Sequence, residues 1–184
     1  MDTSQAAFPN LDELVQLYYD DVSELAQFEA VDGSSMPPVY QKLLDHEHHM
    51  TVTVESHHGC PVDVEVLSYK TLGDSYIRKI LLRRSTDHAV VQFGIVRLHV
   101  NCVSEPVRRE IMSREIPLGR VLINRGVMRR VELSQLWRVV PGNELAGLFK
   151  LKAPTETYGR TAIIHCDGEP AIELLEIVSP EPTE

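Results

Sequence analysis

The sequence predicts an α+β fold: a single antiparallel β-sheet of about six or seven strands, with helices packed on one face. Two observations lead to this prediction. The spacing of apolar residues is helical up to about residue 45 and alternates with a period of two through much of 46–178. The gaps between successive strands are also short, which favours antiparallel neighbours, because a parallel pair needs a crossover of about a dozen residues. With 184 residues, 43% of them hydrophobic, we expect one domain: helices in 1–45, the sheet core in 46–178 and a frayed, acidic tail in 179–184.

Two helices are expected before the sheet. Asn10 can cap the first, with Asp12 and Glu13 near the positive end of its dipole. Apolar side chains then recur every three or four residues over Leu11–Phe28, the pattern of an amphipathic helix. A glycine and two serines end this region. A second, short helix over Pro38–Leu44 begins with proline at its first position.

The next elements are four strands. Apolar and polar residues alternate over Met50–His58, which predicts a half-buried strand that ends at Gly59. The same alternation predicts strands at Val62–Tyr69, Tyr76–Arg84 and Ala89–Val100.

The second half of the chain returns to helices and then to strands. The predicted elements are two helices, a strand, a short helix and two closing strands, at Ser104–Arg114, Pro117–Gly126, Val127–Val140, Asn143–Phe149, Tyr158–Cys166 and Ala171–Val178. Asp167 and Gly168 form a favourable hairpin turn between the last two strands.

Composition argues against several classes of function. The chain has 18 Lys and Arg against 27 Asp and Glu, a formal net charge of −9, which opposes binding to nucleic acid or to an anionic membrane. No apolar run approaches the roughly 20 residues of a membrane helix, and residues 1–10 show no signal peptide. The 3 cysteines are widely spaced, as is typical of reduced thiols. We therefore expect a cytoplasmic protein with no nucleic-acid or membrane partner, and its oligomeric state stays open.

Two charged residues fall on otherwise apolar strand faces. Alternation places Arg78 on the same face as Ile80 and Leu82, and Glu176 on the same face as Leu174. Each charge costs several kcal/mol to desolvate without a partner. Either the two side chains pair with each other or reach solvent at a sheet edge, or they line a pocket in which Arg78 binds a carboxylate. The pattern alone leaves both interpretations open.

An ordered set of short motifs resembles the chorismate lyase family. The motifs, which extend over Leu43–Val178, are Leu43-Leu44-Asp45 with Met50-Thr51, Arg78-Lys79-Ile80-Leu81-Leu82, Pro117-Leu118-Gly119-Arg120, and Asp167-Gly168-Glu169-Pro170 followed by Glu176. The family's enzymes convert chorismate to 4-hydroxybenzoate and pyruvate in one antiparallel α+β domain, without metal or cofactor. The resemblance thus implies a lyase that needs neither.

The resemblance also implies a set of site residues. Arg78 and Glu176 would be catalytic and would bind substrate, and Leu118 and Met50 would complete the binding site. Arg78 suits a carboxylate, and Glu176 could hydrogen-bond the ring hydroxyl or protonate the ether oxygen. Among relatives in the family, the number of residues between the turn glycine (Gly168 here) and the glutamate (Glu176 here) varies by one. Glu173 is therefore the alternative carboxylate.

Two residue clusters suggest other functions. Five of the eight histidines lie in 46–58, where His46 and His48 could bind zinc with His57 or His58, but their spacing matches no known zinc motif. We favour a surface cluster and expect no metal. Arginines concentrated in 108–130 have glutamates as neighbours, which indicates a solvated helix face rather than a nucleic-acid site.

Three functions therefore remain in order of preference. The first is a chorismate–pyruvate lyase, and the second is a non-catalytic sensor domain of the same fold that binds a small aromatic or cyclic acid. The third is an interaction module whose pocket is filled by its own side chains. The net charge of −9 does not oppose a small acidic ligand, because screening over roughly 8–10 Å hides distant charges.

Overall fold

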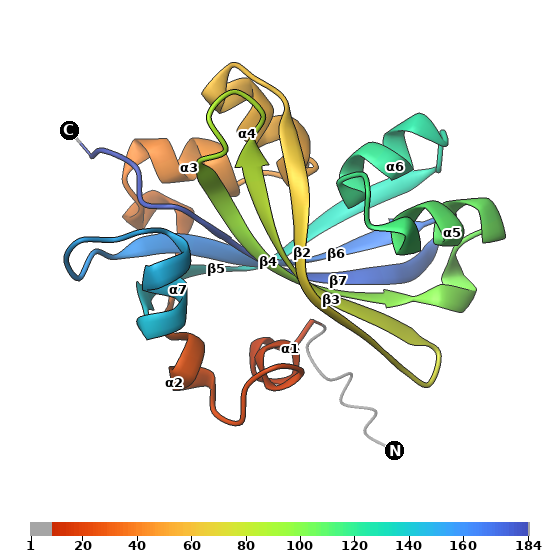
Figure 1. Cartoon of the computed structure of the whole chain (residues 1–184), viewed down its shortest axis with the longest axis horizontal. Coiled ribbons are helices and arrows are strands. Elements are labelled where there is room, and N and C mark those ends of the chain that lie inside the picture. The colour runs from red at the N-terminus through yellow and green to blue at the C-terminus, as the bar shows by residue number, and fades with distance from the viewer. Residues whose placement is uncertain (1–8, 184) are drawn as a thin grey trace.

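The computed structural model describes residues 9–183, and its centre is one seven-stranded antiparallel sheet (Figure 1). The strands are β1 (Ala26–Val31), β2 (Val62–Leu72), β3 (Ser75–Arg84), β4 (Val90–His99), β5 (Arg129–Pro141), β6 (Thr157–Cys166) and β7 (Glu169–Val178). They lie in the order β1-β5-β6-β7-β4-β3-β2. Residues 1–8, most of the segment searched for a signal peptide, and Glu184 lie outside the described residues. The predicted α+β class and antiparallel sheet are confirmed.

Tight turns connect the strands of two antiparallel segments, β2–β3–β4 and β6–β7. β2, β3 and β4 are consecutive neighbours, as their short connections predicted, with Gly73 at φ +54° in the first turn. Asp167 and Gly168 join β6 to β7 and both have positive φ, 51° and 87°, as a type I′ turn requires. β7 then lies between β6 and β4, so Glu176 is in register with Arg160 on one side and Gly94 on the other.

Helices pack on both faces of the sheet, not on one as expected. On one face lie α1 (Leu11–Gln16), α2 (Val22–Leu25) and α7 (Asn143–Leu148), and on the other α3 (Pro38–Leu44), α4 (Met50–His58), α5 (Glu105–Ser113) and α6 (Leu118–Asn124) (Figure 1). Two 3₁₀ turns, Gly33–Ser35 and Val100–Cys102, complete the helical elements. The reason is that β7 is buried at nearly every position, so both of its faces must be covered. No helix in the described part of the chain is long and apolar enough to cross a membrane.

The expected single helix over Leu11–Phe28 is wrong, because two short helices, α1 and α2, and the start of β1 take its place. Asn10 does cap α1, with Oδ1 accepting from the Asp12 amide at 2.9 Å. However, α1 ends at Gln16, and the chain enters the edge strand β1 at residue 26. Phe28 pairs with Val139 of β5 there. Short apolar stretches fit either period, and pairing with β5 decides between them.

The expected strand over Met50–His58 is also wrong, because this segment is helix α4. Met50 and Val54, four residues apart, are both buried, whereas Val52 is 43% exposed. β-branched residues favour strands only weakly, and packing of one helical face against the sheet overrides that preference. Gly59 ends α4 in the left-handed conformation at φ +66°, a helix-stop signal that was interpreted as the end of a strand.

The C-terminal segment is held against the fold and is not frayed over its described part. The Ser179 amide donates to the Val91 carbonyl at 3.0 Å. The Glu181 amide donates to the Tyr40 hydroxyl at 2.8 Å, which ties the segment to α3. Proline-rich composition predicted disorder, but the Glu181 contact depends on a partner 141 residues earlier in the chain, which local composition cannot reveal.

Candidate ligand-binding site

The four residues implied by the family resemblance line one internal cavity between the sheet and the start of α4 and α6. Arg78 projects from β3 and Glu176 from β7, while Met50 and Leu118 are the first residues of their helices. All four side chains are buried. The cavity has a volume of about 40 Å³. The strand alternation that placed both charges on apolar faces therefore identified one common space.

Arg78 is a buried cation without an acidic partner among residues 9–183. It is 1% exposed. Its Nη1 donates to the Ile111 carbonyl at 3.3 Å, and its Nε has no hydrogen-bond partner in the described chain. Burial lowers the pKa of this guanidinium, and the neighbouring Tyr76 opposes the shift only in part. The site thus contains donor capacity that the described residues do not satisfy.

The floor of the cavity contains an unused acceptor and a glycine. Gln92 is 2% exposed and its Oε1 has no hydrogen-bond partner among the described residues. Gly94 follows on the same face of β4 and lies between Ile80 and Glu176 in register. A Cβ at Gly94 would lie 3.4 Å from Ile80. The missing side chain therefore contributes to the open space in the middle of the sheet.

Glu176 pairs with Arg160 and not with Arg78. Arg160 is fully buried on β6, and its Nε donates to Glu176 Oε2 at 2.8 Å. The interpretation in which Arg78 and Glu176 pair, or reach solvent at a sheet edge, is therefore wrong. Sequence reasoning missed Arg160, although it is the single charged residue among the alternate positions from Tyr158 to Cys166. The alternation test that found Arg78 would have found it too.

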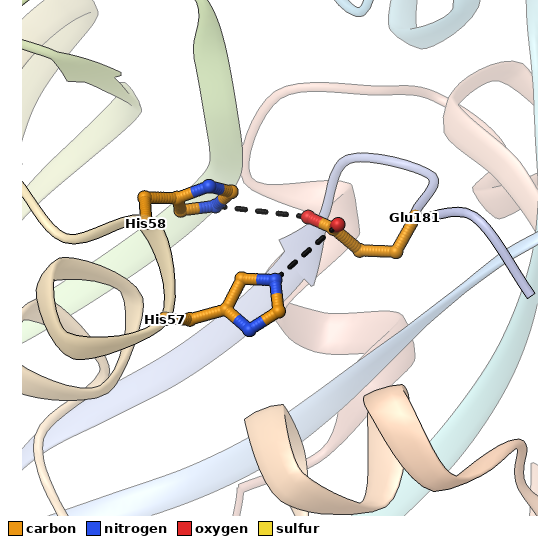
Figure 2. Close-up of side chains that lie close together, drawn as sticks. All are labelled: His57, His58 and Glu181. Atoms are coloured by element: carbon orange, nitrogen blue, oxygen red, sulfur yellow. Dashed lines mark ion pairs between the residues drawn. The ribbon is translucent and has the colours of Figure 1, made fainter.

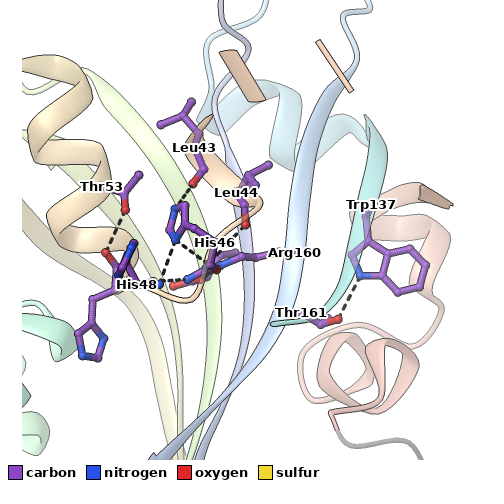
Figure 3. Close-up of polar contacts among 10 residues, drawn as sticks. Leu43, Leu44, His46, His48, Thr53, Trp137, Arg160 and Thr161 are labelled. Carbon is purple, nitrogen blue, oxygen red and sulfur yellow. Dashed lines mark hydrogen bonds and ion pairs between the residues drawn. The ribbon is translucent and has the colours of Figure 1, made fainter. Parts of the chain in front are cut away.

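Arg160 also fastens the connection between α3 and α4 to the sheet (Figure 3). Its Nη1 donates to the His46 carbonyl at 2.8 Å and more weakly to the Leu44 carbonyl at 3.5 Å. Its Nη2 donates to the His48 carbonyl at 2.9 Å. Figure 3 shows Thr161, the next residue, on the other side of the strand, where it accepts from the Trp137 indole at 3.2 Å. Arg160 is therefore a satisfied, structural cation.

His46 is part of this connection rather than of a metal site. Its Nε2 donates to the Leu43 carbonyl at 2.7 Å, and its Nδ1 accepts from the His48 amide at 3.1 Å. Burial, followed by the charge of Arg160, lowers the pKa of His46 to about 4. The ring is therefore neutral near pH 7, and both nitrogens are occupied.

His49 and the start of α4 form the wall of the cavity facing Arg78. His49 is 8% exposed and precedes α4 as its N-cap residue. Its Nε2 accepts from Arg129 Nε at 2.7 Å. Burial, followed by Arg129, lowers the pKa of His49 to about 4, so this ring is neutral too. Met50 and Thr51 bring the first turn of this nine-residue helix to the cavity, where free backbone N–H groups favour an anion.

Glu173, the alternative carboxylate, does not line the cavity. It is fully buried on the opposite face of β7. Arg97 binds it through Nε and through Nη2, the latter at 2.6 Å, and His99 Nε2 lies 2.9 Å from it. The expectation that Glu173 could replace Glu176 is therefore wrong, because adjacent strand residues face opposite ways.

The basic middle of the sequence is balanced by acidic neighbours. Arg109 pairs with Glu105 at 2.5 Å, Arg125 pairs with Glu110, and Arg130 pairs with Glu132 at 3.0 Å. Arg109 and Glu105 lie on the exposed face of α5, as predicted, whereas Arg130 and Glu132 lie on strand β5 and not on a helix.

The fold and the cavity together define an α+β domain with a buried cation beside an enclosed space. No protein-family model matches the sequence, and no curated protein does. Among solved structures, PhnF from Mycobacterium smegmatis aligns with a TM-score of 0.56 and 14% identity, covering 74% of this chain and 65% of PhnF. The present chain therefore spans about two thirds of that protein.

Two further structures correspond to isolated domains. The effector domain of the same PhnF aligns with a TM-score of 0.50 and 14% identity, covering 72% of this chain and 88% of the domain. A structure from Bordetella bronchiseptica, assigned as the ligand-binding domain of a GntR-family transcriptional regulator, aligns with a TM-score of 0.50 and 13% identity, covering 67% and 88%. At these identities the likeness shows the fold, which is the chorismate lyase-like fold that the resemblance implied.

Proposed function

We propose that this chain is a ligand-binding sensor domain that holds a small aromatic or cyclic hydroxy acid in the cavity above the sheet. The ligand carboxylate would pair with Arg78, and its ring would lie against Met50 and Leu118. The observation that carries the proposal is the buried guanidinium of Arg78, which has no acidic partner in the described chain. The likeness to domains assigned as effector or ligand-binding domains supports it.

An unpaired buried cation is costly, so its presence requires a compensating function. Arg160, on the neighbouring strand β6, is a buried arginine whose guanidinium nitrogens each donate a hydrogen bond. Its partners are the Glu176 carboxylate and backbone carbonyls. Arg78 has one carbonyl. A ligand carboxylate could accept two hydrogen bonds from the planar guanidinium. The first residues of α4, which line the same cavity, would add backbone N–H donors.

The remaining polar groups of the cavity favour a ligand that also carries a hydroxyl. Glu176 lines the cavity, and Gln92 Oε1 has no partner in the described chain. Both are acceptors, so a hydroxyl on the ligand can donate to either. The other lining side chains are largely apolar, as is typical of sites for small cyclic molecules.

The small volume of the cavity requires that the site opens on binding. Its volume of about 40 Å³ accommodates a water-sized molecule, whereas ligand sites commonly measure roughly 300–1,000 Å³. The element that moves would be α4, because it packs on α3, α6, β2 and β3 and takes no part in strand pairing. A ligand would therefore select or induce a more open arrangement.

Chorismate cleavage is a second candidate, favoured by the position of Glu176 in the same cavity as Arg78. In that reaction Glu176 would protonate the ether oxygen as the enolpyruvyl group leaves. Its Oε2 already accepts a hydrogen bond from Arg160 Nε at 2.8 Å, and this geometry suits a hydrogen-bond acceptor for a bound ligand. We therefore rank binding above catalysis.

The test compares two matched probes on the purified chain. We expect 4-hydroxybenzoate to raise the melting temperature and its neutral analogue 4-hydroxybenzamide to have no effect, because only the acid can pair with Arg78. At a tenfold excess over Kd the stabilisation is about 1.4 kcal/mol, or roughly 3–6 °C for a chain of this size. In parallel, incubation with chorismate measures release of 4-hydroxybenzoate and pyruvate.

The variant Arg78→Met should abolish the response to the acid, and Arg109→Met, which removes an exposed charge, should preserve it. Chorismate turnover that is lost in Arg78→Met would overturn the sensor proposal in favour of the lyase. No stabilisation by 4-hydroxybenzoate or chorismate, together with no turnover, would contradict both and would favour the interaction module.

A further inference from the structure

The structure divides the histidine-rich segment into two parts. His46 belongs to the connection held by Arg160, whereas His57 and His58 end α4 and point toward Glu181 of the C-terminal segment (Figure 2). His57 Nε2 lies 3.3 Å from Glu181 Oε2, and His58 Nε2 lies 3.6 Å from Oε1. One ligand atom from each of the three residues lies within 4.8 Å of the others. This juxtaposition is independent of the cavity, which these residues do not line.

We propose that His57, His58 and Glu181 form a binding site for a divalent transition-metal ion, with zinc as the expected ion. Two imidazoles and one carboxylate are a common zinc ligand set when a fourth position stays open to water. With zinc–ligand distances of about 2.0–2.2 Å, the ligand atoms of a tetrahedral site lie roughly 3.3–3.6 Å apart. The two histidine–glutamate distances, 3.3 Å to Oε2 and 3.6 Å to Oε1, are of this size, and each imidazole faces a different oxygen of the carboxylate.

Contacts independent of the histidines place Glu181 in position. Its amide donates to the Tyr40 hydroxyl at 2.8 Å, and that hydroxyl lies 3.4 Å from its carbonyl. Tyr40 is 2% exposed and packs against Tyr158 with ring centroids 4.6 Å apart. Binding would therefore require little ordering of the C-terminal segment.

The electrostatics of the cluster suit a cation. The Glu181 carboxylate lies beside both imidazoles, so the cluster offers a negative charge together with two ring nitrogens. The nearby Arg84 is paired with Asp87 at 2.5 Å, which offsets its charge. The side chains of His57, His58 and Glu181 are 28%, 12% and 14% exposed, so an ion can enter from solvent.

The simplest alternative is a pair of histidine–carboxylate hydrogen bonds that fasten the segment without metal. The test is isothermal titration of the untagged, EDTA-treated chain with zinc chloride, with bound zinc measured after dialysis. We expect one zinc ion per chain, a higher melting temperature with zinc, and slower carboxypeptidase digestion of the C-terminus. Cobalt(II) should give the visible absorption of a low-symmetry site.

The single variants His57→Ala and Glu181→Gln should weaken zinc binding by roughly tenfold or more, because each removes one of three ligands. His88→Asn is the matched control: it removes an exposed histidine on the β3–β4 turn, and asparagine tolerates the φ of +59° there. Because His57 is exposed and Glu181 is partly exposed, the variants should keep the melting temperature of the metal-free chain to within a few degrees. Zinc binding that is absent, or equal in His57→Ala and His88→Asn, would overturn the proposal.

Discussion

Arg160 and Glu176 face each other in register on β6 and β7, with Arg160 Nε 2.8 Å from Glu176 Oε2 and both residues buried. The remaining donors of Arg160 bind carbonyls of the segment that leads into α4. One side chain thus links the centre of the sheet to the helix that closes the cavity. Because Arg160 satisfies Glu176, Arg78 is left as the cation available to a ligand.

Replacing Arg160 by methionine should therefore be strongly destabilising. The variant leaves the Glu176 carboxylate and the His46 and His48 carbonyls without their donors, and breaking a buried pair in this way costs about 3–5 kcal/mol. Glu176→Gln should cost less, since the amide oxygen can still accept from Arg160. Urea unfolding followed by circular dichroism measures both values. If Arg160→Met lowers the free energy of unfolding by less than about 1 kcal/mol, the Arg160–Glu176 pair does not stabilise the fold.

Arg78→Met should have the opposite effect on stability. No carboxylate in residues 9–183 depends on Arg78, and the substitution removes a desolvated charge while keeping most of the side-chain volume. We expect the free energy of unfolding to be unchanged or to rise by about 1 kcal/mol, while the response to 4-hydroxybenzoate disappears. If Arg78→Met lowers the free energy of unfolding as much as Arg160→Met does, Arg78 is a structural residue instead.

Strand alternation explains what could be predicted from the sequence. It requires only neighbouring residues, so the hairpins from β2 to β4 and from β6 to β7 were correctly expected. It also placed Arg78 and Glu176 each on an apolar face of its strand, and the structure shows that these faces line one cavity. The pairing of Glu176 with Arg160 could not be predicted in the same way, because it depends on the β6–β7 register, a relation between two strands.

The incorrect predictions share a dependence on distant contacts. Residues 50–58 have a strand-like composition, and the core formed with β3 and α3 makes them helical. β1 is a strand because β5 pairs with it. Glu181 is ordered by Tyr40. In each case a weak local preference yields to packing that involves residues far along the chain.

Stability should fall as the pH is lowered from about 6.5 to about 4. His46 and His49 have a pKa of about 4 in the folded chain, against 6.5 as the ordinary value, because burial disfavours their charged forms. Within this window the unfolded chain binds protons that the folded chain does not, so the free energy of unfolding rises with pH. The slope is at most about 1.4 kcal/mol per pH unit for each histidine.

Urea unfolding at pH 7.0, 5.5 and 4.5 measures this dependence, and His49→Gln provides the comparison. Glutamine can still accept from Arg129 but does not titrate, so its slope between pH 6.5 and 4 should be smaller than that of the unmodified chain. Equal slopes would show that His49 contributes nothing to the pH dependence.

Glu173→Gln should separate the two buried glutamates of β7. The substitution weakens the bidentate contact with Arg97 on the face away from the cavity, which should lower the free energy of unfolding by about 1–3 kcal/mol. The melting-temperature shift produced by 4-hydroxybenzoate should be unchanged in size. A variant that folds and has lost this shift would place Glu173 in the ligand response after all.

Filling the floor of the cavity should block the ligand without altering any charge. In Gly94→Ala the added Cβ lies 3.4 Å from Ile80 and from the Leu175 carbonyl, so the ligand-free chain can accommodate the methyl group. The methyl group nevertheless occupies space in the cavity that a ligand ring would use. We expect stability to change by less than about 1 kcal/mol and affinity for 4-hydroxybenzoate, measured by calorimetry, to fall by roughly tenfold, the effect of a lost 1.4 kcal/mol. Gly147→Ala in α7, where a Cβ meets nothing within 4 Å, is the control and should bind normally. Normal binding by Gly94→Ala would place the ligand elsewhere, because a ring seated between Arg78 and Glu176 must lie over Gly94.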